Sequence, residues 1–296
     1  MTVSTEPRRA PAPAPKPPSP ARRTFAFVNA AAGLLLMVAG GMVTSTASGL
    51  AVPDWPLSYG RWLPAMTGGV FYEHGHRMFA AGVGALILIM AVWTQFADSR
   101  PGVRRLGWWT LALVCGQGVL GGVTVFMGLP ALVSAAHATL GQTIFCLLVV
   151  MAEFVSSPGP VARAPGARAL RALAVAAVAA LWIQLLAGAI MRHGGAGLSW
   201  HLSWAFVAAT TAGAFAAAVY LRGDWPAPLA QGARALLALL GAQILLGVAT
   251  ADFRTLPAPR ANPVMIAVAT AHLAVGAALL ASAVLLCVRV WRADEP

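Results

Sequence analysis

The stretch 117–124, QGVLGGVT, recurs 126 positions later as QILLGVAT at 243–250. Both copies lie inside long apolar segments. Two further pairs occur in the same order, namely GGMVTSTASGL (40–50) with GAIMRHGGAGL (188–198), and HATLGQ (137–142) with HLAVGA (272–277). Self-similar motifs in the same order indicate two copies of one structural unit. The sequence therefore predicts a fold built from two related halves.

The composition indicates an all-α integral membrane protein. Of 296 residues, 59% are hydrophobic and 10% charged, and the mean hydropathy is +0.75. Soluble domains are nearer 45–50% apolar and about 25% charged. The formal net charge of +11 does not indicate a nucleic-acid partner, because the basic residues stand in short loops and tails between apolar runs.

Eight apolar segments are long enough to cross about 30 Å of hydrocarbon as helices. They are 25–48, 73–96, 106–128, 131–156, 169–191, 199–221, 233–250 and 264–289. Together with the repeat they predict two pseudo-symmetric four-helix bundles, an N-terminal one over 25–156 and a C-terminal one over 169–289. Parallel repeats of this kind are related by an axis along the membrane normal.

Basic residues predict the orientation of these helices. Fifteen Lys and Arg residues fall in the segments that are cytoplasmic if the N-terminus is inside, against four in the outer segments. Cytoplasmic loops are enriched in basic residues, so both termini are predicted to be cytoplasmic. Residues 1–24 are basic and proline-rich, which predicts a disordered cytoplasmic tail, and 290–296 form a second tail. The expected location is the cell (plasma) membrane.

Four histidines occupy related places in the predicted helices. The stretch FYEHGHRMFA (71–80) carries one of them into the membrane, where polar residues are costly and usually functional. His76 stands 41 residues before Gln117, and His201 stands 42 before Gln243. The full set is His76, His137, His201 and His272.

Two histidines in each half suit bis-imidazole ligation of heme iron inside a helix bundle. Two other interpretations stay open from the residues alone. One is zinc, although no carboxylate or thiolate accompanies these histidines outside the second helix. The other is a proton pathway made of intramembrane Glu and His side chains.

Glu73 lies three residues before His76 and four before Arg77, so the three share one side of a helix. A local Glu73–Arg77 ion pair is one interpretation. The other places the Glu73 carboxylate beside a bound macrocycle, where it stabilises charge or moves a proton. His74 points to another face and is expected at the membrane interface, while His193 falls in a loop, where it could hold a propionate.

These motifs resemble those of the heme A synthase family. The resemblance is carried by GGMVTSTASGLAVPDWPLSYG (40–60), EHGHR (73–77), SAAHATLGQ (134–142), GAIMRHGGAGL (188–198) and AHLAVG (271–276). It implies oxidation of the C8 methyl group of heme O to a formyl group, giving heme A for cytochrome oxidase.

The resemblance also implies roles for individual residues. Glu73 would be the catalytic carboxylate. His76, His137 and Arg77 would bind the substrate heme O, and His201 and His272 would ligate the iron of a heme b cofactor. The heme O synthase, a protoheme farnesyltransferase, would act upstream, and an unidentified donor would supply electrons. The oligomeric state, homo-oligomer included, stays open.

Two departures from the family pattern stand out. The outer loop after the first helix has no cysteine, and Ser58 stands in the region where many bacterial members carry a cysteine pair. The loop before His201 has almost vanished, so the assignment of His201 rests on its spacing from Gln243. Two rival functions remain: a bis-His diheme electron-transfer protein acting on quinol, and a transporter, which the parallel repeat would favour.

Overall fold

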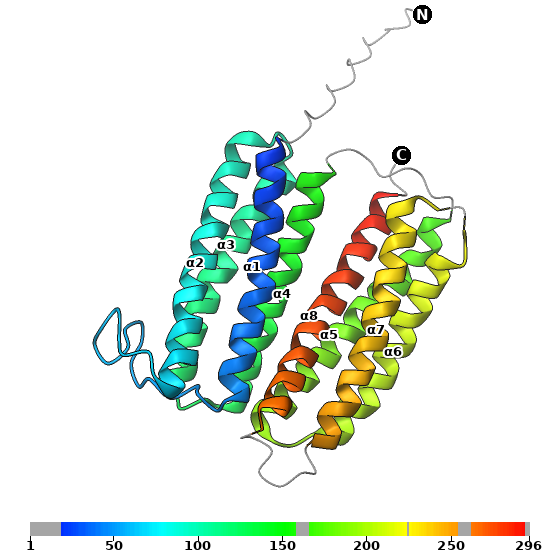
Figure 1. The fold of residues 1–296 in the computed structure, drawn as a ribbon. Helices are drawn as coiled ribbons and strands as arrows, with labels where there is room; N and C mark the ends of the chain where they lie inside the picture. The colour runs from blue at the N-terminus through cyan, green and yellow to red at the C-terminus, as the bar shows by residue number, and fades with distance from the viewer. Residues whose placement is uncertain (1–18, 158–165, 224, 254–261, 294–296) are drawn as a thin grey trace, which may run out of the picture.

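The computed structural model describes residues 19–157, 166–223, 225–253 and 262–293. Over these residues the chain forms long helices joined by short connections (Figure 1). They are α1 (Pro20–Ser45), α2 (Gly68–Ala97), α3 (Pro101–Phe126), α4 (Ala131–Ser156), η1 (Ala167–Leu170, a 3-10 turn), α5 (Arg171–Gly194), α6 (Leu198–Tyr220), α7 (Ala227–Phe253) and α8 (Pro263–Arg292).

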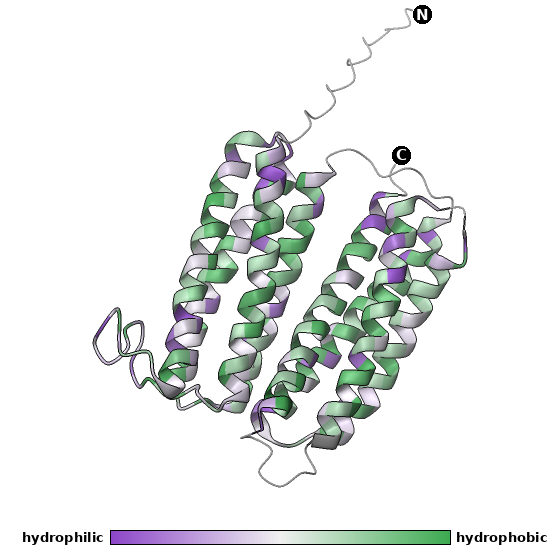
Figure 2. Cartoon of the chain, in the orientation of Figure 1, coloured by the Kyte–Doolittle hydropathy of each residue, from purple (hydrophilic) through white to green (hydrophobic). Residues whose placement is uncertain are grey.

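In the described part of the chain, eight helices are long and apolar enough to span a membrane. Hydrophobic residues cover most of their length, and hydrophilic ones gather mainly toward the helix ends (Figure 2). The predicted all-α multi-pass membrane fold is confirmed.

The helices form two four-helix bundles side by side, α1–α4 and α5–α8 (Figure 1). The bundles meet where α1 and α4 pack against α8 and where α4 packs against α5. Residues 46–67 connect α1 to α2 at one end of the molecule, which we call the loop end; α1 begins and α8 ends at the opposite end. The even-numbered helices α2, α4, α6 and α8 all begin at the loop end. Their first turns therefore lie at similar depth.

Capping interactions determine where some helices start, and hydropathy alone predicts those starts less accurately. The Ser19 side chain accepts a hydrogen bond of 3.3 Å from the Arg22 N–H, and Pro20 occupies the first turn, so α1 starts before the predicted residue 25. Proline is well suited to this position because its missing N–H has no helical partner there. The predicted 1–24 tail overlaps α1, and its residues 1–18 lie outside the described residues. Likewise α8 runs to Arg292, into the predicted 290–296 tail, of which 294–296 lie outside the described residues.

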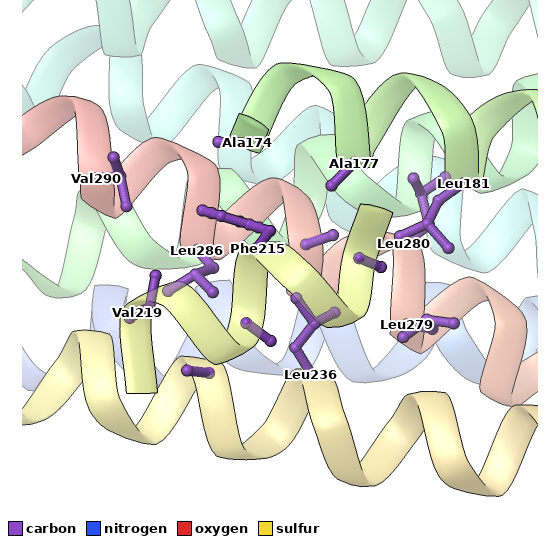
Figure 3. Close-up of a cluster of buried hydrophobic side chains, with 14 of the residues drawn as sticks. Ala174, Ala177, Leu181, Phe215, Val219, Leu236, Leu279, Leu280, Leu286 and Val290 are labelled. Carbon is purple, nitrogen blue, oxygen red and sulfur yellow. The ribbon is translucent and has the colours of Figure 1, made fainter. Parts of the chain in front are cut away.

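The core of the C-terminal bundle combines small and large apolar side chains (Figure 3). Ala174 and Ala177 of α5 are fully buried, which lets the helix backbones approach closely, as is common in membrane bundles. Phe215 of α6 and Leu286 of α8 are also fully buried and fill the space between the helices. This packing fixes the positions of the even helices that carry the histidines.

Two clusters of ion pairs lie at the opposite end. Asp98 follows α2 and pairs with Arg22 at 2.9 Å and with Arg100 at 2.8 Å. Glu153 of α4 pairs with Arg289 at 2.7 Å and Arg292 at 3.3 Å, both on α8. The second cluster thus ties the two bundles together. The sequence analysis used these arginines only as topology signals and missed their acidic partners.

Candidate functional site

Each of the four predicted histidines lies against a glycine of the helix that precedes its own. The measure is the distance from the histidine Cε1 to the place where a Cβ on that glycine would stand. It is 3.2 Å for Gly40 and His76, 3.0 Å for Gly121 and His137, 2.9 Å for Gly188 and His201, and 3.2 Å for Gly247 and His272. A methyl group at any of these positions would press on the ring. The same contact thus occurs four times, once for each even helix.

The histidines form one pair in each bundle. His76 and His137 are close enough to interact electrostatically, and so are His201 and His272. Nδ1 is buried and has no hydrogen-bond partner in His76, His137 and His272. Buried polar atoms are normally satisfied. These rings therefore retain capacity for a partner that the described part of the chain does not provide.

Glutamines from the preceding helices face three of the rings. The Gln117 side-chain nitrogen lies 2.9 Å from the His137 carbonyl oxygen and 3.4 Å from the ring Nε2. The Gln243 nitrogen lies 3.4 Å from Nε2 of His272. The Gln184 nitrogen lies 3.1 Å from Nδ1 of His201. Gln117 and Gln243 belong to the repeated motifs, where they served as markers of register rather than as site residues.

His201 takes its predicted place although the connection before it is short. Only residues 195–197 separate α5 from α6, and Gly195 and Gly197 have φ of +72° and +91°. These left-handed conformations suit glycine because it has no Cβ. They let the chain reverse direction within three residues and begin α6 with His201 one turn in.

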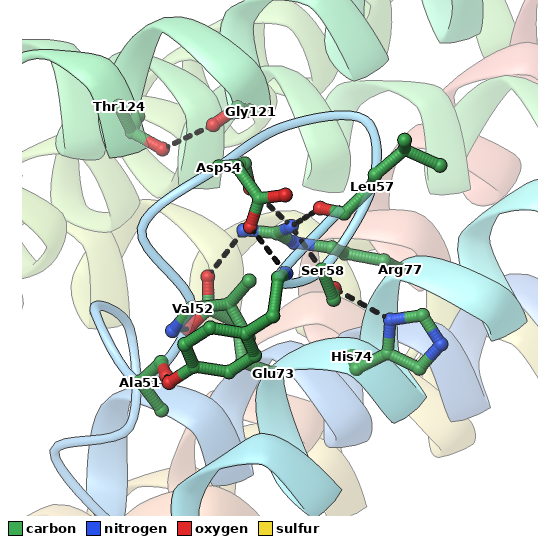
Figure 4. Close-up of polar contacts among 11 residues, drawn as sticks. Ala51, Val52, Asp54, Leu57, Ser58, Glu73, His74, Arg77, Gly121 and Thr124 are labelled. Carbon is green, nitrogen blue, oxygen red and sulfur yellow. Dashed lines mark hydrogen bonds and ion pairs between the residues drawn. The ribbon is translucent and has the colours of Figure 1, made fainter. Parts of the chain in front are cut away.

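The loop 46–67 is fastened to α2 by Arg77 (Figure 4). One guanidinium nitrogen donates to the backbone carbonyls of Asp54 at 2.7 Å and Leu57 at 2.9 Å. The other donates to the Glu73 carboxylate. The second oxygen of Glu73 accepts from the Val52 N–H at 2.8 Å, and Glu73 is only 4% exposed. The local Glu73–Arg77 pair considered from the sequence is present, and it holds the loop as well.

His74 departs from the sequence expectation. It is not at an exposed interface but buried, with 4% of its surface exposed, and its Nδ1 lies 2.7 Å from the Ser58 hydroxyl (Figure 4). The reason is that the loop folds over this face of α2 and covers it. Trp55 of the same loop packs on α3, where a Cβ on Gly122 would lie 2.7 Å from its ring. The neighbouring Gly121 contacts His137, so Trp55 packs one residue from the glycine beside that ring.

Within the loop, Asp54 accepts hydrogen bonds from the backbone N–H groups of Tyr59 at 2.7 Å and Gly60 at 2.8 Å. The hydrogen bond from Gly60 is the largest cause that lowers the pKa of Asp54 below its ordinary value. The Tyr59 hydroxyl in turn donates to the Ala51 carbonyl. The loop thus has internal order of its own besides its attachment to α2.

Polar contacts also cross between the bundles near the loop end. Arg192 of α5 donates to the Ser45 hydroxyl at 2.7 Å and to the Gly41 carbonyl at 3.2 Å, both on α1. The Ser45 hydroxyl is 3.2 Å from that of Thr270 on α8. His193, predicted to be in a loop, instead lies in the last turn of α5 and interacts electrostatically with His137 of the other bundle.

Comparison with known proteins matches this arrangement to one family. The family model described as "Cytochrome oxidase assembly protein", COX15-CtaA, matches residues 67–206. A heme A synthase of Rhizorhabdus wittichii is 28% identical over 319 aligned positions, covering 83% of this chain and 87% of that protein. Those of Symbiobacterium thermophilum and Shouchella clausii are 32% and 26% identical, and the match covers 61% and 57% of their lengths.

Over residues 67–206 the chain is similar to the COX15-CtaA family. The residues matched by the COX15-CtaA model run from just before α2 into α6. They include Glu73, His76, His137 and His201, whereas His272 lies beyond them. The resemblance to the heme A synthase family that the sequence motifs indicated is therefore confirmed.

The residues of the two histidine pairs fit a heme iron with two axial ligands better than a zinc ion. Over the described ranges no group of three or more His, Cys, Asp or Glu side chains is arranged to hold a metal ion. Tetrahedral zinc sites need three or four such ligands. Two imidazoles in each bundle, each with a glycine beside it, match in number and type the axial ligands of a bis-histidine heme.

Proposed function

We propose that this chain is a heme A synthase, which oxidises the C8 methyl group of heme O to a formyl group through hydroxylated intermediates. The observation that carries the proposal is the pair of histidines in each bundle, each ring held against a glycine, with Nδ1 of His76, His137 and His272 unsatisfied among the described residues. Two bundles with one imidazole pair each provide for a substrate heme and a cofactor heme in one chain.

The difference between the bundles supports the assignment of the two sites. The N-terminal pair, His76 and His137, belongs to the bundle that carries the loop 46–67, which is long enough to admit and cover an exchangeable molecule. The C-terminal pair, His201 and His272, follows a connection of three residues between α5 and α6. We therefore assign heme O to the N-terminal pair and a resident heme b to the C-terminal pair.

Three side chains of α2 would serve the substrate site in different ways. His76 would ligate the iron of heme O together with His137. Glu73, one turn earlier, is our catalytic carboxylate, and its position is fixed by the Val52 N–H and by Arg77. Arg77 would act in substrate binding chiefly through the loop, because its guanidinium is committed to loop carbonyls and to Glu73.

A heme b held by His201 and His272 would supply the redox chemistry of the C-terminal bundle. The chain would receive heme O from a heme O synthase of the protoheme farnesyltransferase class, and electrons from a donor outside the described fold. We place the loop end at the outer face of the plasma membrane and both termini in the cytoplasm, since the basic residues favour that orientation.

The function is tested on protein purified from cells that supply heme O. The reduced absorption spectrum is recorded, and the extracted hemes are separated by chromatography, for the wild type and for His201→Ala. We expect heme b and heme A together in the wild type, and loss of heme b in the variant.

Other outcomes separate the rival functions. Heme b without heme A, in cells that supply heme O, would favour a diheme protein that transfers electrons from quinol. Protein without any Soret band would favour a transporter and would contradict both heme functions. Retention of heme b in His201→Ala would contradict the assignment of that ligand.

A further inference from the structure

A cavity between the two bundles lies near the opposite end of the molecule. Its volume is about 180 Å³. The residues that line it include Phe27 and Ala30 of α1, Val149 and Glu153 of α4, and Leu285 and Arg289 of α8. Because α1 and α4 belong to one bundle and α8 to the other, the cavity follows the seam where the bundles meet (Figure 1). On α8, Arg289 is 17 residues beyond His272, which is about 25 Å along the helix, so the cavity is separate from the histidine pairs.

The lining of the cavity changes from polar to apolar with depth. Glu153 and Arg289 are each three residues from the ends of their helices, so they lie about 5 Å from the helix ends. Val149 and Leu285 are seven residues from the same ends, and Ala30 is ten residues into α1. These apolar residues therefore lie about 10–15 Å from the helix ends.

These depths can be compared with the thickness of a membrane. Helix α4 has 26 residues and α8 has 30, which makes them about 39 and 45 Å long. The hydrocarbon layer is about 30 Å thick, so roughly the last 5 Å of each helix lie at the level of the lipid headgroups. The cavity thus has its polar end at headgroup depth and its apolar part in the hydrocarbon layer, which is the polarity profile of a lipid molecule.

Arg289 has hydrogen-bonding capacity left at the polar end. Two of its nitrogens donate to the Glu153 carboxylate, at 3.1 and 2.7 Å, and the third donates to the Pro228 carbonyl at 3.0 Å. Among the described residues these bonds use three of the five N–H groups of the guanidinium. Its side chain is 19% exposed. Guanidinium groups bind phosphate oxygens well, because several N–H groups can donate to them together.

The surroundings of this polar end are positively charged. The two ion clusters described above contain four arginines and two carboxylates, an excess of two positive charges. The clusters adjoin at the end of α4. There Arg100 of the first cluster donates to the Phe154 carbonyl at 2.9 Å, and Arg292 of the second lies over the Phe154 ring. The charge excess therefore favours an anionic headgroup over a zwitterionic one.

We propose that the cavity binds an anionic phospholipid, with the phosphate on Arg289 and an acyl chain along Ala30, Val149 and Leu285. Basic pockets between membrane helices at the cytoplasmic side are suited to such headgroups, and this is the end of the molecule that we place in the cytoplasm. The bound lipid contacts both bundles and so strengthens their association. The site is independent of the hemes.

The test measures lipid retention by the full-length protein. Protein in nonionic detergent is mixed with equal amounts of dioleoylphosphatidylglycerol and dioleoylphosphatidylcholine, and native mass spectrometry counts the lipid molecules that stay bound. We expect the wild type to retain phosphatidylglycerol preferentially. Arg289→Gln should lower the affinity for it roughly 10–100-fold, because a hydrogen bond to a charged group is lost. Ala30→Phe fills the apolar part and should prevent retention.

Two substitutions on α1 are the matched controls. Arg23→Gln removes an exposed arginine near the same end, and Val28→Phe adds the same ring at a position that is 46% exposed. Neither residue is among those that line the cavity, so both variants should retain phosphatidylglycerol like the wild type. If Arg289→Gln behaves like Arg23→Gln, or Ala30→Phe like Val28→Phe, the proposal is overturned.

Glu153→Gln separates lipid binding from the joining of helices. It breaks the same ion pair as Arg289→Gln but removes a negative charge beside the phosphate, so we expect phosphatidylglycerol retention equal to the wild type or higher. Loss of the lipid in Glu153→Gln would mean that the ion pair only holds the helices together, and would overturn the proposal. Equal retention of both lipids by the wild type would do the same, as would inorganic phosphate that raises the thermal midpoint as much as phosphatidylglycerol does.

Discussion

At the scale of single residues, the candidate ligands depend on glycines one helix earlier in the chain. A histidine ring can bring its Cε1 edge this close to a neighbouring helix only where that helix has no side chain. The contact recurs at His76, His137, His201 and His272. Glycine normally weakens a helix by about 1 kcal/mol relative to alanine. Its presence at these places therefore reflects the space that the rings require.

Gly121→Ala tests this requirement. The new methyl group would stand 3.0 Å from Cε1 of His137, so the ring must move by a few tenths of an ångström. Displacement of a reacting group can cost up to about 100-fold in rate, and we expect heme A production to fall roughly tenfold. The measurement is the ratio of heme A to heme O extracted from cells that express equal amounts of protein.

Gly116→Ala provides the control on the same helix, because a Cβ there meets nothing within 4 Å. It should leave heme A production unchanged, and the better helix propensity of alanine should leave the thermal midpoint equal or slightly higher. Equal production by Gly121→Ala and Gly116→Ala would show that the ring tolerates the methyl group.

At the scale of elements, hydropathy predicted the eight helices but neither their exact starts nor the loop contacts between them. The length of each segment follows from the thickness of the hydrocarbon layer, so the predicted 131–156 coincides with α4. Starts such as Pro20 depend on capping by Ser19, which a hydropathy window does not detect. The register of His201 was predictable because Gln243 repeats Gln117 in the sequence.

The loop 46–67 could not be predicted in the same way. Its contacts join residues far apart in sequence, such as Val52 with Glu73 and Asp54 with Arg77. An irregular segment has no periodicity from which such pairs can be inferred. For the same reason His74 was expected at an interface, although the loop buries it.

Arg77→Lys tests how the loop is held. A lysine ammonium cannot reproduce the fork of a guanidinium that donates to the Asp54 and Leu57 carbonyls and to Glu73 together. Losing one hydrogen bond to a charged group costs about 1.5–3 kcal/mol, so the loop should open more often. We expect protease cleavage within 46–67 to accelerate roughly tenfold in membrane vesicles that expose the loop end.

Arg61→Lys is the control for this experiment. Arg61 is an exposed residue of the same loop, and it is joined to Ser58 by backbone hydrogen bonds. Its cleavage rate should match the wild type. Similar acceleration in both variants would mean that the hydrogen bonds of Arg77 do not protect the loop, because both substitutions keep the positive charge.

The ion cluster that follows α2 predicts a dependence of stability on pH. Burial raises the pKa of Asp98, but hydrogen bonds from Arg100 and the charges of Arg100 and Arg22 outweigh it, so the pKa is below its ordinary value of 3.8. The carboxylate therefore contributes stability above that value, and the contribution is lost as pH falls through the lowered pKa.

Thermal unfolding in detergent between pH 7 and pH 3 measures this contribution. We expect Asp98→Asn to be less stable than the wild type at pH 7, because Arg22 loses its buried charged partner, and to lose less stability on acidification below about pH 4. Parallel curves for the two proteins would contradict a role for Asp98 in acid sensitivity.

At the scale of the whole molecule, the two bundles must work as one unit if electrons pass from one heme to the other. They meet along α1, α4, α5 and α8. The ion pairs of Glu153 join them at the opposite end, and the contacts of Arg192 join them near the loop end. Of these two groups, only the contacts of Arg192 lie close to the histidine pairs, since Arg192 interacts electrostatically with His272.

Arg192→Gln tests whether this contact aligns the two sites. Arg192 reaches from α5 to the Ser45 hydroxyl and the Gly41 carbonyl of α1, and Gly41 follows Gly40, the residue in contact with His76. A shorter, neutral side chain cannot hold α1 in this way. Because each histidine pair lies within one bundle, we expect heme b to remain bound while heme A production falls roughly tenfold, as for other small displacements of reacting groups.

Arg171→Gln is the matched control, because it removes an arginine from the other end of the same helix, where Arg171 lies over the Trp291 ring. Its heme b content and heme A production should both stay near the wild type. The decisive measurement is the ratio of heme A to heme b in each purified variant. A fall in heme b for Arg192→Gln would place the role of Arg192 inside the C-terminal site, and an unchanged ratio would mean that the bundles are aligned by their apolar contacts alone.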